Sequence, residues 1–390
     1  MGKEGRILII DFTNFEDYPI GGYLSFAKSL MESFGPDLAL AGITTSDADP
    51  VGKWFKKNIG GSDYDFFAMA RYDVSKTRHL IPDRLVSYLL LRYYKNRISA
   101  INIDNVFLQR QELLISFAGS KSGNICYCFA GLENPLSFSK YGYALFISNW
   151  FERIFFNRLK SVKTILASGD DTAIKEMIIR SRGVLSGLPV IKFPTRINID
   201  IFRPFNEDES RKKLNLPDTS TILLTTGRLA PFKGWKFMVD CFIIFEKAVS
   251  DSRFYFIGEG EDYEKIEDYI SLHNLTDKVF LLGKKRPDEI AQFLNACDLF
   301  IMGSYKEGWS TSLIEAIACG TPACVTNFSS AKEIIEEGEN GFVIDEHNED
   351  LFVKAMIKAL KIARPVRNDN VIRFSSDKLK SDLLRYWKIA

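Results

Sequence analysis

Short apolar runs alternate with helical patterns along the chain. Residues 6–12 (RILIIDF) form an apolar, β-branched run that predicts a buried strand, and residues 21–31 begin with two glycines and continue with apolar positions at helical spacing. A strand, a glycine turn and a helix form the start of a βα unit. Residues 163–168 and 172–180 predict a second strand and helix. The first half is therefore predicted to be an α/β domain.

The second half alternates more regularly. Its short apolar runs predict strands at 222–226, 254–257, 278–282, 299–302 and 323–326. The segments that connect or follow them predict helices at 235–249, 263–272, 288–296, 313–319 and near 349–363. Strands joined by helices predict a doubly wound parallel sheet, which binds ligands at the carboxyl ends of its strands.

Prolines and charge mark the domain boundaries. Pro189, Pro194 and Pro204 interrupt regular structure, and the charged stretch NEDESRKK follows. We predict a first domain at 1–188, a linker at 189–205, a second domain at 206–365 and a C-terminal helix within 366–390. That helix offers Leu379, Leu383, Tyr386 and Trp387 for packing back on the first domain. Two such domains leave a cleft between their strand ends, which suits a two-substrate reaction.

Length and composition agree with a folded enzyme of two or three domains, since the chain has 390 residues, of which 46% are hydrophobic and 26% charged. The six cysteines are irregularly spaced and predict buried thiols, and the start carries no secretory signal, so we expect a cytoplasmic protein. No run of 18 apolar residues predicts a membrane span. The formal net charge is +1, and we expect no nucleic-acid partner.

One segment of the first half is both basic and aromatic. Residues 71–163 hold 14 Lys or Arg against 6 Asp or Glu, and RLVSYLLLRYYKNR and NWFERIFFNRLKSVK mix these cations with aromatic residues. Such helices either bury their aromatics and solvate their cations, or lie on an anionic membrane surface. Both interpretations stay open, and the second predicts a peripheral protein on the inner face of the membrane.

Two motifs of the second half carry the candidate chemistry. In GRLAPFKG, Arg228 and Lys233 lie close together after a strand, and two such cations need an external anion or a nearby carboxylate. A phosphate group would serve. In EGWSTSLIEAIACGTP, Glu307 lies in a loop before a helix whose amides 309–312 could receive an anion or sugar hydroxyls. Glu315 either accepts from hydroxyls or completes a capping box with Ser312. A phosphate flanked by polyols is a nucleotide sugar.

These residues resemble the retaining glycosyltransferase family 4 (glycosyl transferases group 1), which has the GT-B fold and is marked by an Arg and a Lys after the first donor-domain strand and by a Glu-x7-Glu motif. The resemblance covers most of the second half and is weaker in the first. It implies two Rossmann-like doubly wound domains facing a cleft, of which the first (1–188) would bind the acceptor and the second (206–365) the nucleotide-sugar donor. It also implies a hexosyltransferase that moves a sugar from a UDP- or GDP-sugar to a glycan or lipid-linked acceptor, in bacterial O-antigen, capsule or lipopolysaccharide biosynthesis.

The resemblance also implies residue roles. Arg228 and Lys233 would clamp the donor diphosphate and stabilise the leaving group, Glu307 would hold the donor sugar, and Glu315 would accept from the ribose. The catalytic candidates are Arg228, Lys233 and Glu307. Other donor contacts would come from Gly21, Gly22, Gly308, Trp309, Ser310, Thr311 and Ser312, and the base would lie near Gly283, Lys284, Lys285 and Arg286.

The first domain departs from the family pattern. Many relatives carry a histidine there that touches the donor sugar, but residues 124–135 (NICYCFAGLENP) hold none. Glu133 and Asn134 are candidate substitutes, with a turn before Pro135 as the alternative. The chain's histidines, His79, His273 and His347, are expected on the surface or in packing. The missing histidine keeps open a non-catalytic nucleotide-sugar-binding partner; a sugar-nucleotide epimerase would need acid/base groups that these motifs lack.

We expect no metal and no cofactor beyond the nucleotide sugar. Two Asp-x-Asp pairs, Asp47 with Asp49 and Asp63 with Asp65, resemble metal-binding motifs of the other large glycosyltransferase fold, but both are expected in polar turns. The cations of GRLAPFKG would make a metal redundant. The GEG at 258–260 is interpreted as a turn, because Tyr263 replaces the last glycine of a dinucleotide fingerprint.

Overall fold

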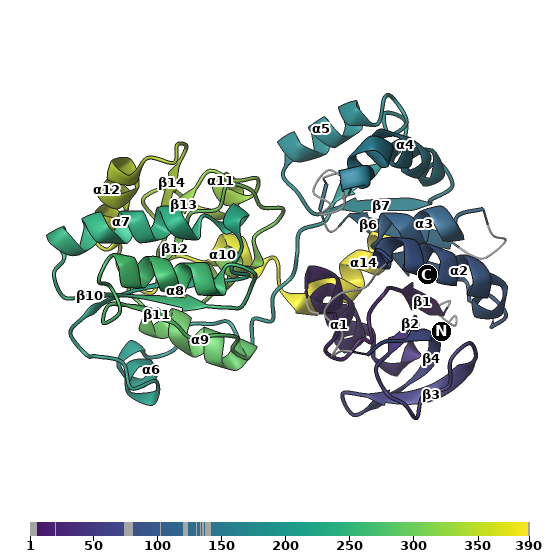
Figure 1. Cartoon of the computed structure of the whole chain (residues 1–390), viewed down its shortest axis with the longest axis horizontal. Coiled ribbons are helices and arrows are strands. Elements are labelled where there is room, and N and C mark those ends of the chain that lie inside the picture. The colour runs from purple at the N-terminus through teal and green to yellow at the C-terminus, as the bar shows by residue number, and fades with distance from the viewer. Residues whose placement is uncertain are drawn as a thin grey trace. The chain divides into compact units, whose positions relative to one another are not determined.

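The computed structural model describes residues 6–19, 21–73, 81–101, 103–119, 124–129, 131, 132, 134, 136 and 142–388, with the backbone alone for 142–145 (Figure 1). The chain forms two compact units. The first comprises the residues up to Pro194 together with those from Asp377 on, and the second is Thr195–Ser376. His79 and Glu133, named above as candidates, lie outside the described residues.

The first unit is built on one mixed sheet. Within the described residues its strand order is β3-β4-β2-β1-β5-β6-β7-β8, and all neighbours are parallel except β3 and β4. The strands are β1 (Ile7–Ile10), β2 (Ala39–Thr44), β3 (Trp54–Ile59), β4 (Ser62–Arg71), β5 (Asn105–Leu108), β6 (Asn124–Phe129), β7 (Thr164–Ala167) and β8 (Val190–Lys192).

The antiparallel pair β3–β4 is a hairpin that the sequence interpretation missed. Gly60 and Gly61 join the strands with φ of 59° and 84°, a left-handed backbone that glycine adopts without strain. The prediction that Asp63 and Asp65 lie in a polar turn is therefore wrong: both belong to β4. The signal was present, since a Gly-Gly pair between two strand-like runs favours a two-residue hairpin turn.

In the described part of the chain, two helices cover one face of this sheet and four cover the other. α1 (Gly22–Phe34) and α14 (Leu379–Trp387) pack together on the first face, where Leu379, Leu383 and Trp387 are buried against strand residues. This confirms that the C-terminal helix returns to the first unit. The second face carries α2 (Asp83–Ile98), α3 (Gln111–Phe117), α4 (Gly142–Leu159) and α5 (Asp171–Arg180).

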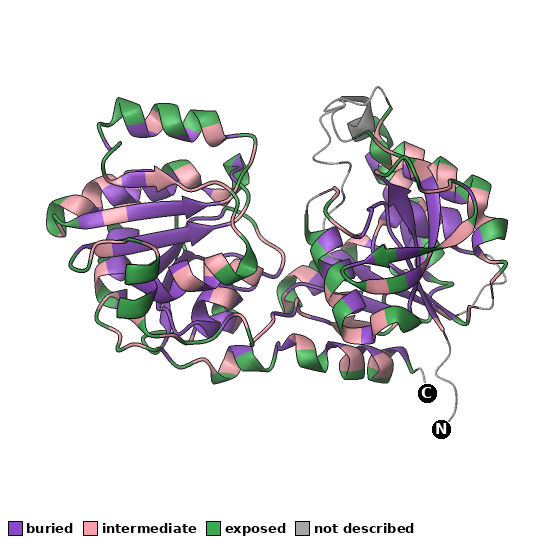
Figure 2. Ribbon diagram, turned by 90° about the horizontal axis from the view of Figure 1, so that it is seen from below, coloured by how far each residue is buried: buried purple, intermediate pink, exposed green. Residues whose placement is uncertain are grey.

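The second unit has a parallel sheet of order β11-β10-β9-β12-β13-β14 within the described chain. The strands are β9 (Thr221–Thr226), β10 (Ser252–Ile257), β11 (Val279–Leu281), β12 (Leu299–Met302), β13 (Ala323–Thr326) and β14 (Gly341–Ile344), and Figure 2 shows that they are largely buried. All except β14 are predicted by the apolar runs. The outcome confirms the predicted pair of Rossmann-like sheets.

Helices lie on both faces of this second sheet (Figure 1). One face carries α7 (Trp235–Ala248), α8 (Tyr263–Leu272) and α12 (Glu349–Ala359). The other carries α9 (Pro287–Ala296) and α10 (Thr311–Ala318), with the short α6 (Glu207–Lys213), α11 (Ala331–Ile334) and α13 (Asp369–Ile372) around them.

The predicted linker 189–205 is divided between the two units. β8 belongs to the first sheet, whereas Ile197 and Phe202 are buried in the second core. The amide of Ile197 donates to Phe374 O at 3.0 Å, and the amide of Ser376 donates to Ile197 O at 2.7 Å. Residues 366–376, which we assigned to the C-terminal segment, therefore lie in the second unit because their apolar side chains complete its core.

Each sheet has a point where the strand order reverses. In the second unit β9 neighbours β12, and the connections from these two strands lead to opposite sides of the sheet. In the first unit the corresponding neighbours are β1 and β5. Loops that leave such a pair of strands at their carboxyl ends diverge and leave a crevice, which is where ligands bind in doubly wound sheets.

Candidate functional site

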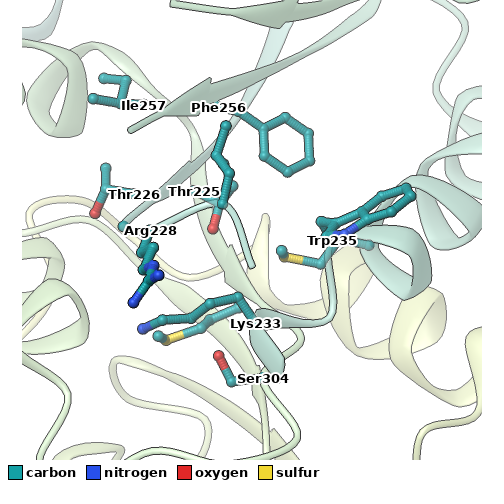
Figure 3. Close-up of a pocket in the computed structure, with 12 residues that line it drawn as sticks. Thr225, Thr226, Arg228, Lys233, Trp235, Phe256, Ile257 and Ser304 are labelled. Atoms are coloured by element: carbon teal, nitrogen blue, oxygen red, sulfur yellow. The ribbon is translucent and has the colours of Figure 1, made fainter. Parts of the chain in front are cut away.

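A pocket lies at the carboxyl end of β9, at the reversal point of the second sheet (Figure 3). Arg228 and Lys233 extend toward the same side of it, and Ser304 lies beside Lys233. Its lining is Thr225, Thr226, Gly227, Arg228, Leu229, Lys233, Trp235, Met238, Phe256, Ile257, Met302 and Ser304. The pocket thus joins the loop after β9 to the loop after β12.

Glycines allow these loops to approach each other closely. Gly234 has a left-handed φ of 66°, and a Cβ there would lie 1.9 Å from Gly303 O, so no side chain fits. Gly258 is similarly restricted, since its Cβ would lie 1.8 Å from Gly227 O. The GEG of residues 258–260 lies in the loop between β10 and α8, and the amide of Leu229 donates to Glu259 O at 3.0 Å.

Both cations of GRLAPFKG have carboxylate partners. Lys233 Nζ lies 2.6 Å from Glu307 Oε1, and these side chains are 19% and 11% exposed. Ser304 Oγ donates to the same carboxylate oxygen at 2.7 Å. Arg228 Nε lies 2.9 Å from Glu261 Oε2, but that pair is 65% and 48% exposed. An exposed pair of this kind contributes about 1 kcal/mol or less, so an anionic ligand can replace Glu261 at little cost.

The helix after Glu307 begins earlier than predicted. α10 starts at Thr311, and its N-cap is Ser310, whose Oγ accepts from the amide of Leu313 at 3.3 Å. The capping box assigned to Ser312 and Glu315 is therefore wrong, because Ser310 holds the cap position. Glu315 is left without that structural role, and burial raises its pKa to about 8.

The residues between Glu307 and Glu315 differ in what they expose to the pocket. The backbone amide of Ser310 donates a hydrogen bond to Ser330 Oγ at 3.0 Å, so this amide is not open to a ligand. Trp309 is 6% exposed and its ring packs edge-on against Phe374, so its side chain belongs to the core. Thr311 and Ser312 form the first turn of α10, where backbone amides have no partner within the helix.

Several polar groups converge beside Gly227. A Cβ at Gly227 would lie 3.7 Å from Lys233 Nζ and 3.9 Å from Ser312 Oγ, which places these two side chains around the same small space. Thr226 lines the pocket, and its buried Oγ1 has no hydrogen-bond partner within the described part of the chain. A buried hydroxyl without a partner is costly unless a ligand or water supplies one.

The loop assigned to the nucleotide base lies next to this space. Gly283 follows β11 with φ of 65°, and its carbonyl accepts from the amide of Gly258 at 2.9 Å. Arg286 caps α9 and pairs with Asp288 at 3.0 Å. Lys284 and Lys285 belong to the same loop. The loops after β9, β10 and β11 therefore form one continuous edge.

The other predicted residues lie in the first unit. Gly21 has φ of 154°, a backbone conformation that favours glycine whatever the space around it, and Gly22 begins α1. A Cβ at either position would have no neighbour within 4 Å in the described residues, so space does not require a glycine at Gly22. Asn134 is buried and donates to Ser148 Oγ at 2.8 Å, which favours the structural alternative for this residue.

Sequence interpretation missed a buried network at the reversal point of the first sheet. Asp11 follows β1 and is fully buried, and Arg110, two residues after β5, places Nε 2.5 Å from Asp11 Oδ1. Gln109 Nε2 donates to Asp11 Oδ2 at 3.2 Å, and the guanidinium of Arg110 lies 4.4 Å from the centroid of the Tyr23 ring. The available signal was the position of polar residues directly after two apolar strands.

Three of the Asp-x-Asp carboxylates form ion pairs, and the fourth accepts a hydrogen bond. Asp49 lies 3.0 Å from Lys57, and Asp65 pairs with Lys56 at 3.1 Å and with Arg6. Asp47 is 3.7 Å from Arg71, and Asp63 accepts from Asn58. Among the residues that the structure describes, no three His, Cys, Asp or Glu side chains group in a way that would hold a metal.

Two units, each built on a doubly wound Rossmann-like sheet, form the GT-B fold. Residues 206–371 match the family "Glycosyl transferases group 1". The match lies within the second unit, Thr195–Ser376.

The chain resembles known proteins both in sequence and in fold. It is 26% identical over 220 residues (55% of this chain, 54% of the relative) to the Escherichia coli UDP-Gal:alpha-D-GlcNAc-diphosphoundecaprenol alpha-1,3-galactosyltransferase. Its fold is similar to that of sucrose-phosphate synthase from Thermosynechococcus elongatus (TM-score 0.75, 16% identity, 97% of this chain and 98% of that one). It is also similar to that of Anabaena HepE in complex with UDP and glucose (TM-score 0.70, 15% identity, 98% and 99%). The sequence matches span 34%, 54% and 22% of the first three curated relatives.

Proposed function

We propose that the protein is a retaining glycosyltransferase that moves a hexose from a nucleoside-diphosphate sugar to a glycan or lipid-linked glycan. The observation that carries this proposal is the pairing of Lys233 with Glu307 across the reversal point, with Arg228 beside it. The complexes of HepE with UDP and glucose support UDP as the nucleotide, and the name of the Escherichia coli relative supports a lipid-linked acceptor. We propose that this transfer takes part in surface-polysaccharide biosynthesis.

The site suits a reaction in which charge develops on the diphosphate. When the bond from the sugar C1 to the phosphate oxygen breaks, its electron pair stays on the diphosphate, where Arg228 and Lys233 stabilise it. The acceptor hydroxyl forms the new bond to C1 on the same face and gives its proton to the departing phosphate oxygen. Glu307 would hold the sugar hydroxyls, and Glu315 those of the ribose. This route needs neither the missing histidine nor a metal ion.

Turnover of the donor separates this function from a non-catalytic binding role. We expect the isolated protein to release nucleoside diphosphate from UDP-glucose, UDP-galactose or GDP-mannose in the presence of a glycan acceptor. Glu307→Ala should remove the release, whereas Glu264→Ala, an exposed change on α8, should not. Nucleotide binding without turnover in any combination would favour the binding partner instead.

We also infer peripheral contact with an anionic membrane. The exposed face of α2 carries Leu85, Leu89 and Tyr93, and α4 exposes Phe146 (90%) and Trp150 (65%). Arg92 and Arg153 are exposed on the same two helices, so the face combines apolar and basic groups. No described helix is long and apolar enough to cross a bilayer. Co-sedimentation with vesicles rich in phosphatidylglycerol, lost in Trp150→Ser and absent with phosphatidylcholine, tests this contact.

A further inference from the structure

The loop that carries Glu307 begins at Gly303, and the backbone carbonyl of Gly303 is held by a histidine from another loop of the second unit. His347 lies between β14 and α12, and its Nε2 is 3.2 Å from Gly303 O. A carbonyl oxygen only accepts hydrogen bonds, so Nε2 carries the proton and donates it. The same carbonyl faces Gly234, at the end of the Lys233 loop. His347 therefore contacts the point where the two loops of the pocket meet.

Aromatic rings hold the imidazole in this orientation. Tyr305 stacks on His347 with ring centroids 4.0 Å apart and planes 12° apart. Phe237, from the first turn of α7, meets His347 edge-on at 5.0 Å. The backbone of Gly303 packs against α7, since a Cβ at this position would be 2.8 Å from the Met238 side chain. The hydrogen bond is thus directed by packing on both sides.

The residues that follow Gly303 lead directly to the proposed site. The Ser304 hydroxyl donates a hydrogen bond to Glu307 Oε1 at 2.7 Å, and the backbone carbonyl of Ser304 accepts one from Thr326 Oγ1 at 2.7 Å. The amide of Tyr305 donates to Phe232 O at 2.9 Å, next to Lys233. Release of the Gly303 carbonyl would therefore loosen Ser304 on one side and the Lys233 loop on the other.

We propose that His347 is a positioning residue of the donor site, which through its hydrogen bond to Gly303 holds Ser304 where it orients Glu307 against Lys233. This proposal rests on the function proposed above. His347 acts through Gly303 and Ser304. Because Glu307 is assigned to the sugar and Lys233 to the diphosphate, the effect should be larger for a nucleotide sugar than for the nucleotide alone.

Three variants separate the hydrogen bond from the packing. His347→Gln keeps an N–H donor at the end of the side chain, and His347→Phe keeps the ring stacked on Tyr305 but removes the donor. His273→Phe is the matched control, because His273 packs on Tyr269 at 4.5 Å at the end of α8 and belongs to neither loop. Thermal melting of each variant shows whether it is folded, and titration calorimetry with UDP, UDP-glucose, GDP and GDP-mannose measures binding.

We expect His347→Phe to weaken binding of the nucleotide sugar by about tenfold, the loss of roughly one hydrogen bond, and to weaken the free nucleotide less. His347→Gln should recover most of the affinity, and His273→Phe should bind like the parent. Equal binding by His347→Phe and the parent, or an equal loss in the Gln and Phe variants, would overturn the assignment. A parent protein that binds none of the four ligands would instead contradict the proposed function, and His347 would lose its role with it.

Discussion

Lys233 Nζ and Glu307 Oε1 lie 2.6 Å apart, although 74 residues separate them along the chain. One follows β9 and the other follows β12, the two strands between which the order of the second sheet reverses. The pair therefore bridges the crevice where a doubly wound sheet binds its ligand. Because both side chains are largely buried, each requires the other until a ligand enters.

The Arg228–Glu261 pair predicts that removing a competing carboxylate raises affinity. Glu261→Gln should strengthen binding of UDP or GDP up to about threefold at low ionic strength, because an exposed ion pair contributes about 0.5 kcal/mol. The gain should shrink in high salt. Calorimetric titration measures it, with Glu264→Gln, an exposed change in the first turn of α8, as the control. Weaker nucleotide binding by Glu261→Gln would mean that Glu261 contacts the ligand itself.

Burial of Glu315 predicts a pH-dependent stability of the second unit. The folded protein holds this proton up to a pKa of about 8, whereas an exposed glutamic acid loses it near 4.3. Between these values the unfolded chain binds fewer protons, so the free energy of unfolding should fall as pH rises, by up to about 1.4 kcal/mol per unit. The fall should end above pH 8.

Glu315→Gln isolates this contribution. Denaturant titrations from pH 5 to pH 9 should show a smaller loss of stability for this variant than for the parent, and Glu264→Gln should follow the parent. Parallel pH profiles for the parent and Glu315→Gln would mean that Glu315 is charged in the folded protein at neutral pH.

The C-terminal helix α14 packs in the core of the first unit, so we expect removal of a buried side chain from this helix to destabilise that unit strongly. Trp387 is fully buried and packs near Phe107 of β5. Trp387→Ala should lower the free energy of unfolding of the first unit by about 3–5 kcal/mol. Trp150→Ala removes a ring that is 65% exposed and should change stability little. Equal effects of the two changes in chemical denaturation would contradict this packing.

Independence from metal is also testable. If Arg228 and Lys233 carry the charge of the leaving diphosphate, donor turnover should be unchanged in excess EDTA. Activity that requires added manganese would instead assign a role to one of the Asp-x-Asp pairs. Asp49→Asn then tests the first pair and Asp65→Asn the second, with nucleoside diphosphate release as the assay.

Most elements of the second unit follow from local pattern, because each strand is a short apolar run and each helix has one apolar face. The predicted helix at 263–272 coincides with α8. The start of α10 was missed by two residues because Ser310 and Ser312 both suit an N-cap, and only the backbone decides between them. The carboxylate partners of Arg228 and Lys233 were not predictable in the same way. Glu261 and Glu307 lie far along the chain, and the sheet order brings them to the cations.

Contacts between residues far apart in the sequence, such as those in the first unit, could not be predicted from the sequence alone. Asp11 and Arg110 are 99 residues apart and meet only because β1 neighbours β5. His347 is similar: its role depends on the contact with Gly303, 44 residues away. Polar residues at strand ends are recognisable from sequence, but which of them meet depends on strand order.

Nucleotide binding by the parent and by Lys233→Gln tests the central claim most directly. A thermal-shift panel of UDP, GDP, ADP and CMP, with their common sugar conjugates, should show one nucleotide class that raises the melting temperature of the parent. A ligand at 100 times its Kd stabilises by about 2.7 kcal/mol. Lys233→Gln should lose this shift, while Lys236→Gln, an exposed change on α7 outside the pocket, should keep it. A shift that is equal in the parent and in Lys233→Gln would contradict the assignment of the pocket to a nucleoside diphosphate.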